Sequence, residues 1–339
     1  MKAVGLYQYL PIENEQSLVD VQIDRPNPTG KDLLVKVRAI SVNPVDTKVR
    51  AHKSDTETTP RILGYDAAGE VAAIGAEVTC YAVGDQVYYA GDITRPGSNS
   101  EYQLVDERIV GKKPASLTFD KAAALPLTSI TAWEGLFERL GISPRGEDAG
   151  KSILIIGGAG GVGSMAIQLA KQLAKLHVVA TASRPESIAW IKKLGADQVV
   201  NHRNALDKEL SAIALPQVDY IFCLNNTTQH WAAMANAIAP QGRICSIVET
   251  PDPVDLDVLK SKSATFVWEF MFTRSMYQTA DIIEQQRLLT SIATLIDKGK
   301  LVTTVNDVIR PINAANLRKA HALVEQGSSI GKIVLADWA

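Results

Sequence analysis

Three glycines, Gly158, Gly160 and Gly163, have the spacing in this chain that most directly indicates chemistry. They follow an apolar run over 153–156 and precede a segment whose apolar residues recur every three or four positions, which predicts a strand, a tight turn and a helix. In such a turn the first glycine permits the turn, the second lets a pyrophosphate approach the backbone, and the third packs the helix against the strand. This context predicts a dinucleotide site, and a flexible glycine loop is the alternative. The residues expected to bind the phosphates are Gly158, Ala159, Gly160, Gly161, Val162 and Gly163.

The end of the next predicted strand, over 176–181, indicates which dinucleotide binds. A carboxylate at that position binds the ribose 2′-hydroxyl of NAD and repels a 2′-phosphate. No carboxylate stands at this tip, and Ser183 and Arg184 follow it. Both side chains can hydrogen-bond a phosphate, so they predict NADPH as the cofactor. The competing interpretation makes Arg184 a solvated loop residue, and Glu186 is expected near the start of the next helix.

The elements that must hold these residues alternate between strand and helix. Over 125–272 this alternation predicts a doubly wound parallel sheet with helices on both faces, including a helix over 129–140 and a final strand over 265–272. Residues 1–124 contain short strands separated by turn residues, which predicts a compact barrel-like unit. The tail over 273–339 carries two amphipathic helices and a last strand, which can return to complete that first unit.

Composition and charge disfavour several classes of function. The 339 residues predict two domains, and a formal net charge of −2 without a basic block disfavours nucleic acid as a partner. No apolar run reaches the about 18 residues of a membrane span, and the N-terminal residues lack the pattern of a signal peptide. Three cysteines, Cys80, Cys223 and Cys245, are not in C-x-x-C spacing. These features predict a cytoplasmic protein that acts on a small molecule, with neither nucleic acid nor membrane as partner.

Six stretches, in order, resemble the medium-chain dehydrogenase/reductase superfamily. They are residues 41–46, 63–71, 83–87, 127–133, the glycine turn and 331–335. Within that superfamily the chain is most similar to the zinc-free quinone oxidoreductase group. The resemblance implies an α/β fold in which a GroES-like β-barrel catalytic domain, 1–124 and 273–339, is interrupted by a Rossmann-fold NADPH-binding domain, 125–272. It also implies an active site in the cleft between the domains and a homodimer, since Rossmann edge strands in this superfamily often pair between subunits.

The resemblance also raises the question of a metal. Zinc members hold a catalytic ion with a cysteine, a histidine and a further cysteine or carboxylate. Here residues 42–46 contain no cysteine, Tyr65 replaces the histidine and is followed by Asp66, and 91–102 lack the structural-zinc cysteines. The histidines are scattered, and each is interpreted as an ordinary buried or surface residue: His52, His177, His202, His230 and His321. We therefore predict no zinc.

Without a metal, the expected reaction is hydride transfer from NADPH to a quinone or an α,β-unsaturated carbonyl, whose developing oxyanion must be stabilised. The resemblance makes Asn43 the first candidate near the nicotinamide and the substrate, and Thr131, beside the cofactor at the start of a helix, the second. It also assigns Lys332 to the cofactor site. The alternative for Asn43 is a turn residue that precedes Pro44.

Two further positions depart from the pattern of the group. Lys48 stands where many quinone oxidoreductases carry a tyrosine, so it either donates to the oxyanion or points to water, with solvent supplying the proton. Tyr65 either places its hydroxyl in the cleft or packs internally. Asp46 is expected to cap its helix or to pair with Arg50.

Two other functions remain compatible with the sequence. One is a zinc-type alcohol dehydrogenase or ketone reductase. The other is a non-catalytic NADPH-binding protein, since some relatives have structural or RNA-binding roles.

Overall fold

The computed structural model describes residues 1–51 and 53–339, which divide into two compact units. Unit 1 comprises Met1–Ile130 and Phe272–Ala339, and unit 2 comprises Thr131–Met271. His52, one of the five histidines considered above, lies outside the described residues. No helix within the described ranges is long and apolar enough to cross a membrane.

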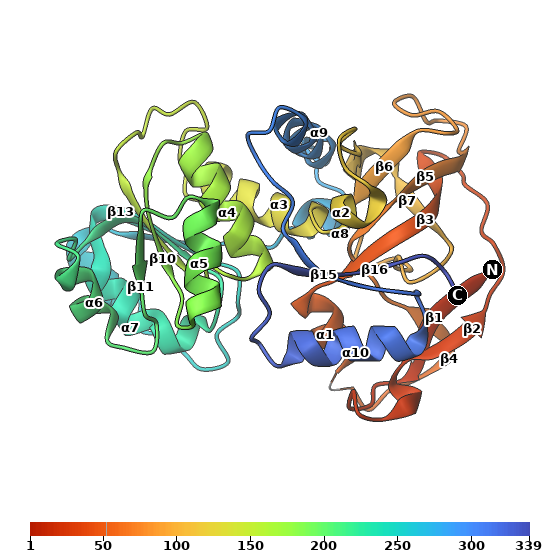
Figure 1. Ribbon diagram of the computed structural model, residues 1–339, viewed down its shortest axis with the longest axis horizontal. Helices are drawn as coiled ribbons and strands as arrows, with labels where there is room; N and C mark the ends of the chain where they lie inside the picture. Colours follow the sequence, from red (N-terminus) through yellow and green to blue (C-terminus); the bar gives the residue numbers. More distant parts are fainter. Residues whose placement is uncertain (52) are drawn as a thin grey trace. The chain divides into compact units, whose positions relative to one another are not determined.

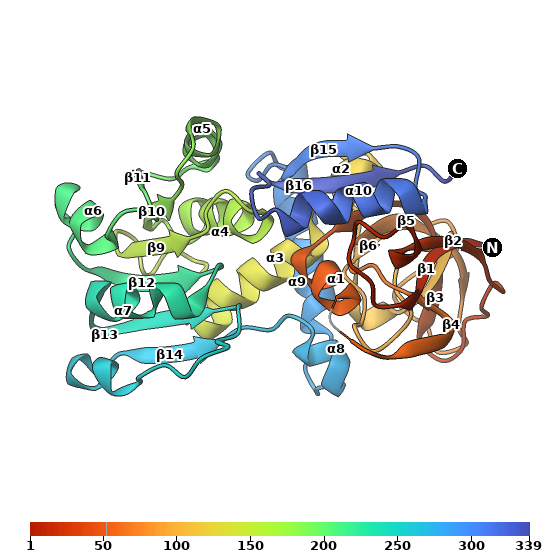
Figure 2. The same ribbon diagram turned by 90° about the horizontal axis from the view of Figure 1, so that it is seen from below.

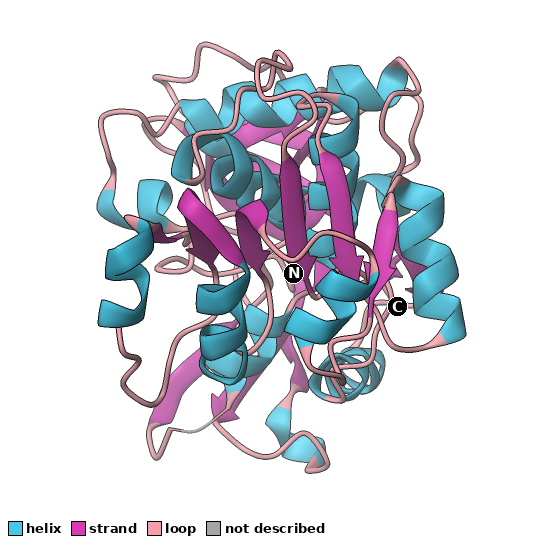
Figure 3. Cartoon of the chain, turned by 90° about the vertical axis from the view of Figure 1, so that its left-hand side faces the viewer, coloured by secondary structure: helices cyan, strands magenta, loops and turns pink. Residues whose placement is uncertain are grey.

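Unit 2 is built on a six-stranded sheet whose neighbouring strands are all parallel, and Figure 3 shows helices on both sides of them. The strand order is β11-β10-β9-β12-β13-β14, which in chain order is the doubly wound arrangement of dinucleotide-binding domains. The central strand β9 is buried along its whole length, as expected for a strand covered on both faces. The predicted α/β class with a doubly wound sheet is therefore confirmed. The strands are β9 (Ser152–Ile156), β10 (His177–Thr181), β11 (Gln198–Val200), β12 (Val218–Cys223), β13 (Ile238–Ser246) and β14 (Thr265–Trp268).

The helices of unit 2 connect these strands and differ from the prediction at one end of the unit. The predicted helix over 129–140 begins earlier, as α3 (Pro126–Trp133), which starts in unit 1 and ends in unit 2. Proline fits the first turn of a helix. It continues as the π-helical segment η3 (Glu134–Arg139). The predicted strand over 265–272 ends at Trp268, where the buried Glu269 binds Arg139. The other helices are α4 (Gly161–Gln172), α5 (Pro185–Leu194), α6 (Leu206–Ala212), α7 (Thr227–Ala237) and the 3-10 segment η4 (Asp257–Lys262).

Unit 1 contains two sheets, visible in Figures 1 and 2. The larger has the order β15-β16-β3-β5-β6-β8 with β7 also paired to β3, and the smaller has the order β2-β1-β4. The hydrogen-bonded path does not close among the described strands, so the predicted barrel is two sheets. The strands are β1 (Lys2–Gln8), β2 (Val19–Gln22), β3 (Asp32–Val42), β4 (Thr56–Ile62), β5 (Ala67–Ile74), β6 (Gln86–Tyr89), β7 (Tyr102–Asp106), β8 (Val110–Lys112), β15 (Val305–Ile309) and β16 (Lys332–Ala336).

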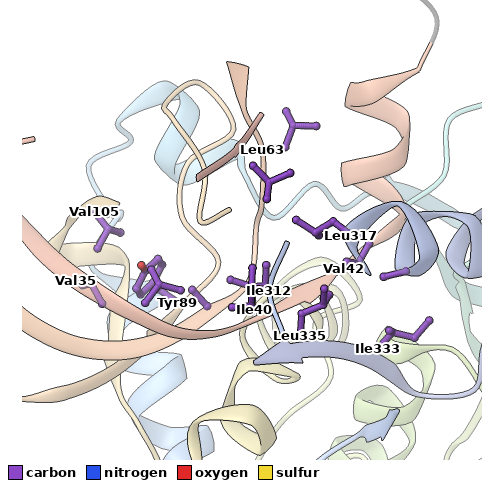
Figure 4. Packing of buried hydrophobic residues seen from close by; sticks show 14 of the residues in the cluster. Val35, Ile40, Val42, Leu63, Tyr89, Val105, Ile312, Leu317, Ile333 and Leu335 are labelled. Atoms are coloured by element: carbon purple, nitrogen blue, oxygen red, sulfur yellow. The ribbon is translucent and has the colours of Figure 1, made fainter. Parts of the chain in front are cut away.

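The last strand, β16, lies antiparallel to β3 from the N-terminal part of the chain. Ile333 stands opposite Val42, and Leu335 stands opposite Ile40. Figure 4 shows these side chains packed together in the core of unit 1. This pairing brings Lys332, the first residue of β16, beside Asn43, which follows β3 directly. The helical elements of unit 1 are η1 (Glu15–Ser17), α1 (Pro44–Arg50), η2 (Glu107–Ile109), α2 (Phe119–Ala123), α8 (Thr273–Tyr277), α9 (Glu284–Asp297) and α10 (Ala314–Glu325).

Candidate functional site

The turn after β9 is made by a glycine that precedes the predicted pattern. Gly157 has φ +89°, a left-handed conformation that favours glycine. Gly158, the first glycine of the pattern, does not have a positive φ. A Cβ on Gly158 would instead lie 2.9 Å from Cβ of Ala180 in β10. Gly158 therefore permits close packing against the neighbouring strand, while Gly157 makes the turn.

The other two glycines of the pattern have the surroundings that a phosphate cradle needs. A Cβ on Gly163 would lie 2.4 Å from the carbonyl oxygen of Gly157, so the first turn of α4 sits directly on the glycine turn. A Cβ on Gly160 would have its nearest neighbour, the same oxygen, 3.7 Å away, so the backbone there can be approached closely. Helix α4 begins at Gly161, and the N–H groups of its first turn have no partner within the helix. A pyrophosphate fits this combination of open backbone and helix N-terminus.

Ser183 and Arg184 follow the end of β10, at the tip that was predicted to read the ribose. Arg184 is the N-terminal cap residue of α5, and its Nε lies 3.4 Å from Oε1 of Glu186. Glu186 belongs to the first turn of α5, where a carboxylate is stabilised by the helix dipole. About a third of the Arg184 side chain is exposed. A 2′-phosphate bound there would share the guanidinium with Glu186.

A buried polar group joins the end of β3 to the start of β16 in unit 1. The Lys332 ammonium lies 3.1 Å from Oδ2 of Asp66, donates to the Val42 carbonyl at 2.9 Å, and donates to Oδ1 of Asn43. Asn43 Nδ2 donates to Oδ2 of Asp66 at 2.8 Å, and the backbone N–H of Leu127 donates to Oδ1 at 2.8 Å. Both Asp66 oxygens and both ends of the Asn43 side chain therefore have partners inside unit 1. We call Asn43, Asp66 and Lys332 the buried triad.

Asp46 lies next to the buried triad, on the first turn of α1. Its Oδ2 accepts the backbone N–H of Asn43 at 2.7 Å, so the predicted capping role is observed. Its Oδ1 is buried without a hydrogen-bond partner among the described residues. Burial raises the pKa of Asp46 to about 7, against the lowering effect of the Asn43 N–H and the Lys332 charge. The alternative pairing with Arg50 is not observed, because that guanidinium binds Glu325 instead.

The charges of the buried triad are also perturbed by their burial. Burial raises the pKa of Asp66, and the positive charge of Lys332 opposes that rise. Burial lowers the pKa of Lys332, and the Asp66 carboxylate opposes that fall. Each charge therefore offsets part of the desolvation of the other, as expected for an ion pair removed from water.

The remaining predicted residues have different environments. Tyr65 is buried and meets the Phe272 ring edge-on, with centroids 5.4 Å apart. Burial raises the pKa of the Tyr65 hydroxyl, and the Asp46 carboxylate raises it further, so the hydroxyl keeps its proton. Lys48 is exposed on α1. Thr131 is buried within α3 and does not lie at the start of the helix.

The groups at the metal position do not fit a zinc ion. Asn43 and Tyr65 supply neither thiolate nor imidazole, which are the ligands that zinc prefers. Asp66 is the available carboxylate, and its two oxygens already accept three donors, one of them cationic. An ammonium 3.1 Å from that carboxylate would repel a divalent cation. Within residues 1–51 and 53–339, no three His, Cys, Asp or Glu side chains gather as a metal site.

Unit 2 has a buried ionic group of its own, which the sequence did not predict. Arg139 Nε lies 2.8 Å from Oε2 of Glu269, and its Nη2 lies 3.9 Å from Oε2 of Glu134. Burial and the neighbouring Glu134 raise the pKa of Glu269 to about 9. One of the two carboxyls, Glu134 and Glu269, therefore keeps a proton at neutral pH.

Sequence signals for these buried ion pairs exist but are weak. Lys332 opens the otherwise apolar segment that becomes β16, and Glu269 interrupts an aromatic run. A charged residue in a buried segment indicates a buried partner. The partner itself, Asp66 or Arg139, is distant in sequence, so the signal names only one member of each pair.

Comparison with known proteins agrees with the fold of the two units. The alcohol dehydrogenase GroES-like domain family matches residues 29–115, and the zinc-binding dehydrogenase family matches residues 194–335. A zinc-type alcohol dehydrogenase-like protein of Staphylococcus epidermidis is 43% identical over 336 residues, which are 99% of each chain. A Rhizobium etli CFN 42 protein with a provisional zinc-dependent alcohol dehydrogenase name has a crystal structure that matches with TM-score 0.95. It is 49% identical, over 100% of this chain and 98% of that one.

Relatives with reductase names are more distant. The quinone oxidoreductase of Coxiella burnetii is 28% identical, with TM-score 0.81 over 99% of both chains. The 2-methylene-furan-3-one reductase of Solanum lycopersicum is 39% identical over 208 residues, which are 58% of this chain and 50% of that protein. The full-length match at 43% identity shows that the chain belongs to the medium-chain dehydrogenase/reductase superfamily of oxidoreductases, among the zinc-type alcohol dehydrogenase-like proteins.

Proposed function

We propose that this protein is an NADPH-dependent reductase that transfers hydride to quinones or α,β-unsaturated carbonyls without zinc. The observation that carries the proposal is the chemistry of the buried triad, whose amide and ion pair are poor ligands for zinc. A metal-free site suits substrates that accept hydride at a conjugated position. The named substrate of the tomato reductase, a methylene-furanone, is such a conjugated ketone.

The chain's own residues would supply binding, orientation and charge. Residues 158–163 would hold the pyrophosphate, and Ser183 and Arg184 the 2′-phosphate. Bound NADPH supplies the hydride. Transfer to the β-carbon of an enone leaves an enolate, whose oxygen needs a donor and which takes a proton from solvent. Donors aimed at such an oxygen are each worth about 10²–10³ in rate.

The candidates for that donor are Asn43, Lys48, Tyr65 and Thr131. The contacts of Asn43 inside the buried triad favour a positioning role, because both ends of its side chain are occupied. Lys48 is exposed and Tyr65 retains its hydroxyl proton, so both can donate. Tyr65→Phe and Lys48→Met separate them: the variant that loses kcat with a conserved NADPH affinity identifies the donor.

The cofactor choice can be tested with a matched pair of arginines. Arg184 and Arg145 each pair with a glutamate two residues later, at 3.4 Å and 3.3 Å. Arg184→Ala should weaken NADPH binding about ten- to a hundredfold and leave NADH binding unchanged, because a charge-assisted hydrogen bond contributes about 1.5–3 kcal/mol. Arg145→Ala should change neither affinity. Calorimetric titration of both variants with both nucleotides checks this, and an unchanged NADPH to NADH ratio in Arg184→Ala would count against the assignment.

We also propose that the protein is a cytoplasmic homodimer. Strand β14 is an edge of the unit 2 sheet, and Trp268 at its end is 48% exposed. An unpaired edge with an exposed aromatic residue can pair with a second copy. Light scattering during gel filtration should give twice the chain mass, and Trp268→Asp should reduce it to one chain.

A further inference from the structure

Unit 1 contains an open cavity of about 440 Å³ that lies outside the buried triad. Its walls come from β4, from the loop over 93–96 and from Ile23. The volume is within the range of small-molecule sites. Apolar and charged side chains both line it: Ile23, Ile62, Ile93, Glu57, Arg61 and Arg95. We call it the Arg61 cavity.

Two of its three charges are held by protein partners. The Arg95 guanidinium makes a bidentate pair with the Asp32 carboxylate, with distances of 2.8 Å and 2.9 Å. The Glu57 carboxylate accepts the Tyr9 hydroxyl. These contacts fix both groups in the wall of the cavity and neutralise the charge of Arg95.

Arg61 is the cation of the cavity that can meet a ligand. Its Nη1 donates to the Tyr9 hydroxyl at 2.7 Å, while its nearest approach to Oε1 of Glu57 is 3.9 Å, beyond a hydrogen bond. It also interacts with the Tyr65 hydroxyl. A guanidinium has five N–H donors, and about a third of this side chain is exposed. A second cation is close, since the Lys53 ammonium lies 5.3 Å from the centre of the Tyr9 ring.

We infer that the Arg61 cavity binds a small apolar molecule that carries a carboxylate. The carboxylate would pair with the planar fork of Arg61, and the aliphatic body would lie against Ile23, Ile62 and Ile93. A carboxylate fits better than a phosphate dianion, because Glu57 would repel the second negative charge. The inference does not depend on the proposed reductase function.

The test uses equilibrium binding to the full chain with three soluble probes of equal length: hexanoate, hexan-1-ol and hexylammonium. Hexanoate should bind at one site per chain and at least about tenfold tighter than hexan-1-ol, because a charge-assisted hydrogen bond adds to the same apolar contact. Isoleucine-methyl NMR locates the site, and the methyls of Ile62 and Ile93 should shift on addition of hexanoate. Equal affinity for hexanoate and hexan-1-ol, or tighter binding of hexylammonium, would overturn the inference.

Variants assign the effect to Arg61. Arg61→Met should weaken hexanoate binding about tenfold or more and leave hexan-1-ol unchanged. Arg38→Met is the matched control, since Arg38 is an exposed arginine of unit 1 that also lies 3.9 Å from a glutamate, Glu70. Glu57→Gln should strengthen hexanoate binding by removing the repulsive charge. This variant tests the cavity independently if Arg61→Met does not fold. Hexanoate binding that is insensitive to both Arg61→Met and Glu57→Gln would refute the role of this cavity.

Discussion

Lys332→Met separates a structural role of Lys332 from a role in binding the cofactor. The substitution keeps the length and apolar stem of the side chain and removes an ammonium that contacts Asp66, Val42 and Asn43. Asp66 is then left as a buried carboxylate without its countercharge, and its remaining side-chain partners are two neutral N–H donors, from Asn43 and Leu127. Removing one partner of a buried ion pair costs about 3–5 kcal/mol.

That cost is a large fraction of the about 5–15 kcal/mol that stabilises a typical folded protein. Urea unfolding, followed by circular dichroism at neutral pH, should show a midpoint lowered accordingly. Lys300→Met is the control, because Lys300 is exposed and should be replaceable without cost. Adding Asp66→Asn to Lys332→Met should recover part of the loss, since it removes the uncompensated charge. A Lys332→Met variant that unfolds like the parent and loses only NADPH affinity would refute the structural role and favour the predicted cofactor contact.

Three further predictions concern the buried Glu269 and the glycine turn of unit 2. The pKa of Glu269 is raised from 4.5 to about 9 in the fold, so the unfolded chain releases that proton first and stability should fall as pH rises through this window. Glu269→Gln, which stays neutral, should flatten the pH dependence of the melting temperature and raise it at pH 8; a lower value at pH 8 would instead indicate an ionised pair with Arg139. Gly163→Ala should lower both stability and NADPH affinity, because its Cβ would lie 2.4 Å from a backbone oxygen. Gly160→Ala, whose Cβ has 3.7 Å of room, should fold normally and lose only NADPH affinity; equal melting temperatures for the two alanine variants would contradict this difference.

Local signals predicted the start of the parallel sheet of unit 2 well. The strand, turn and first turn of α4 were placed correctly, because apolar periodicity and glycine spacing act within about a dozen residues. The turn itself was assigned to Gly158, whereas Gly157 has the positive φ. A φ angle depends on how the strand leaves the sheet, and the glycine spacing alone does not determine it.

Long-range pairing explains most of what the sequence did not predict. Strand β1 pairs with β4, a polar and partly exposed strand more than 50 residues later, so local patterns do not identify this pairing. The Lys332–Asp66 pair joins the last strand to the segment between β4 and β5, and only the fold brings the two residues together. The helix predicted over 129–140 begins three residues earlier, at Pro126, because proline is favoured in the first turn of a helix.

Metal content measured together with turnover tests whether this protein transfers hydride without zinc. The protein should be purified without chelator, analysed for zinc by mass spectrometry, and assayed for NADPH oxidation with an enone and a quinone before and after chelation. We expect zinc well below one ion per chain and turnover that chelation does not change. Stoichiometric zinc whose removal abolishes turnover, and whose return restores it, would contradict it.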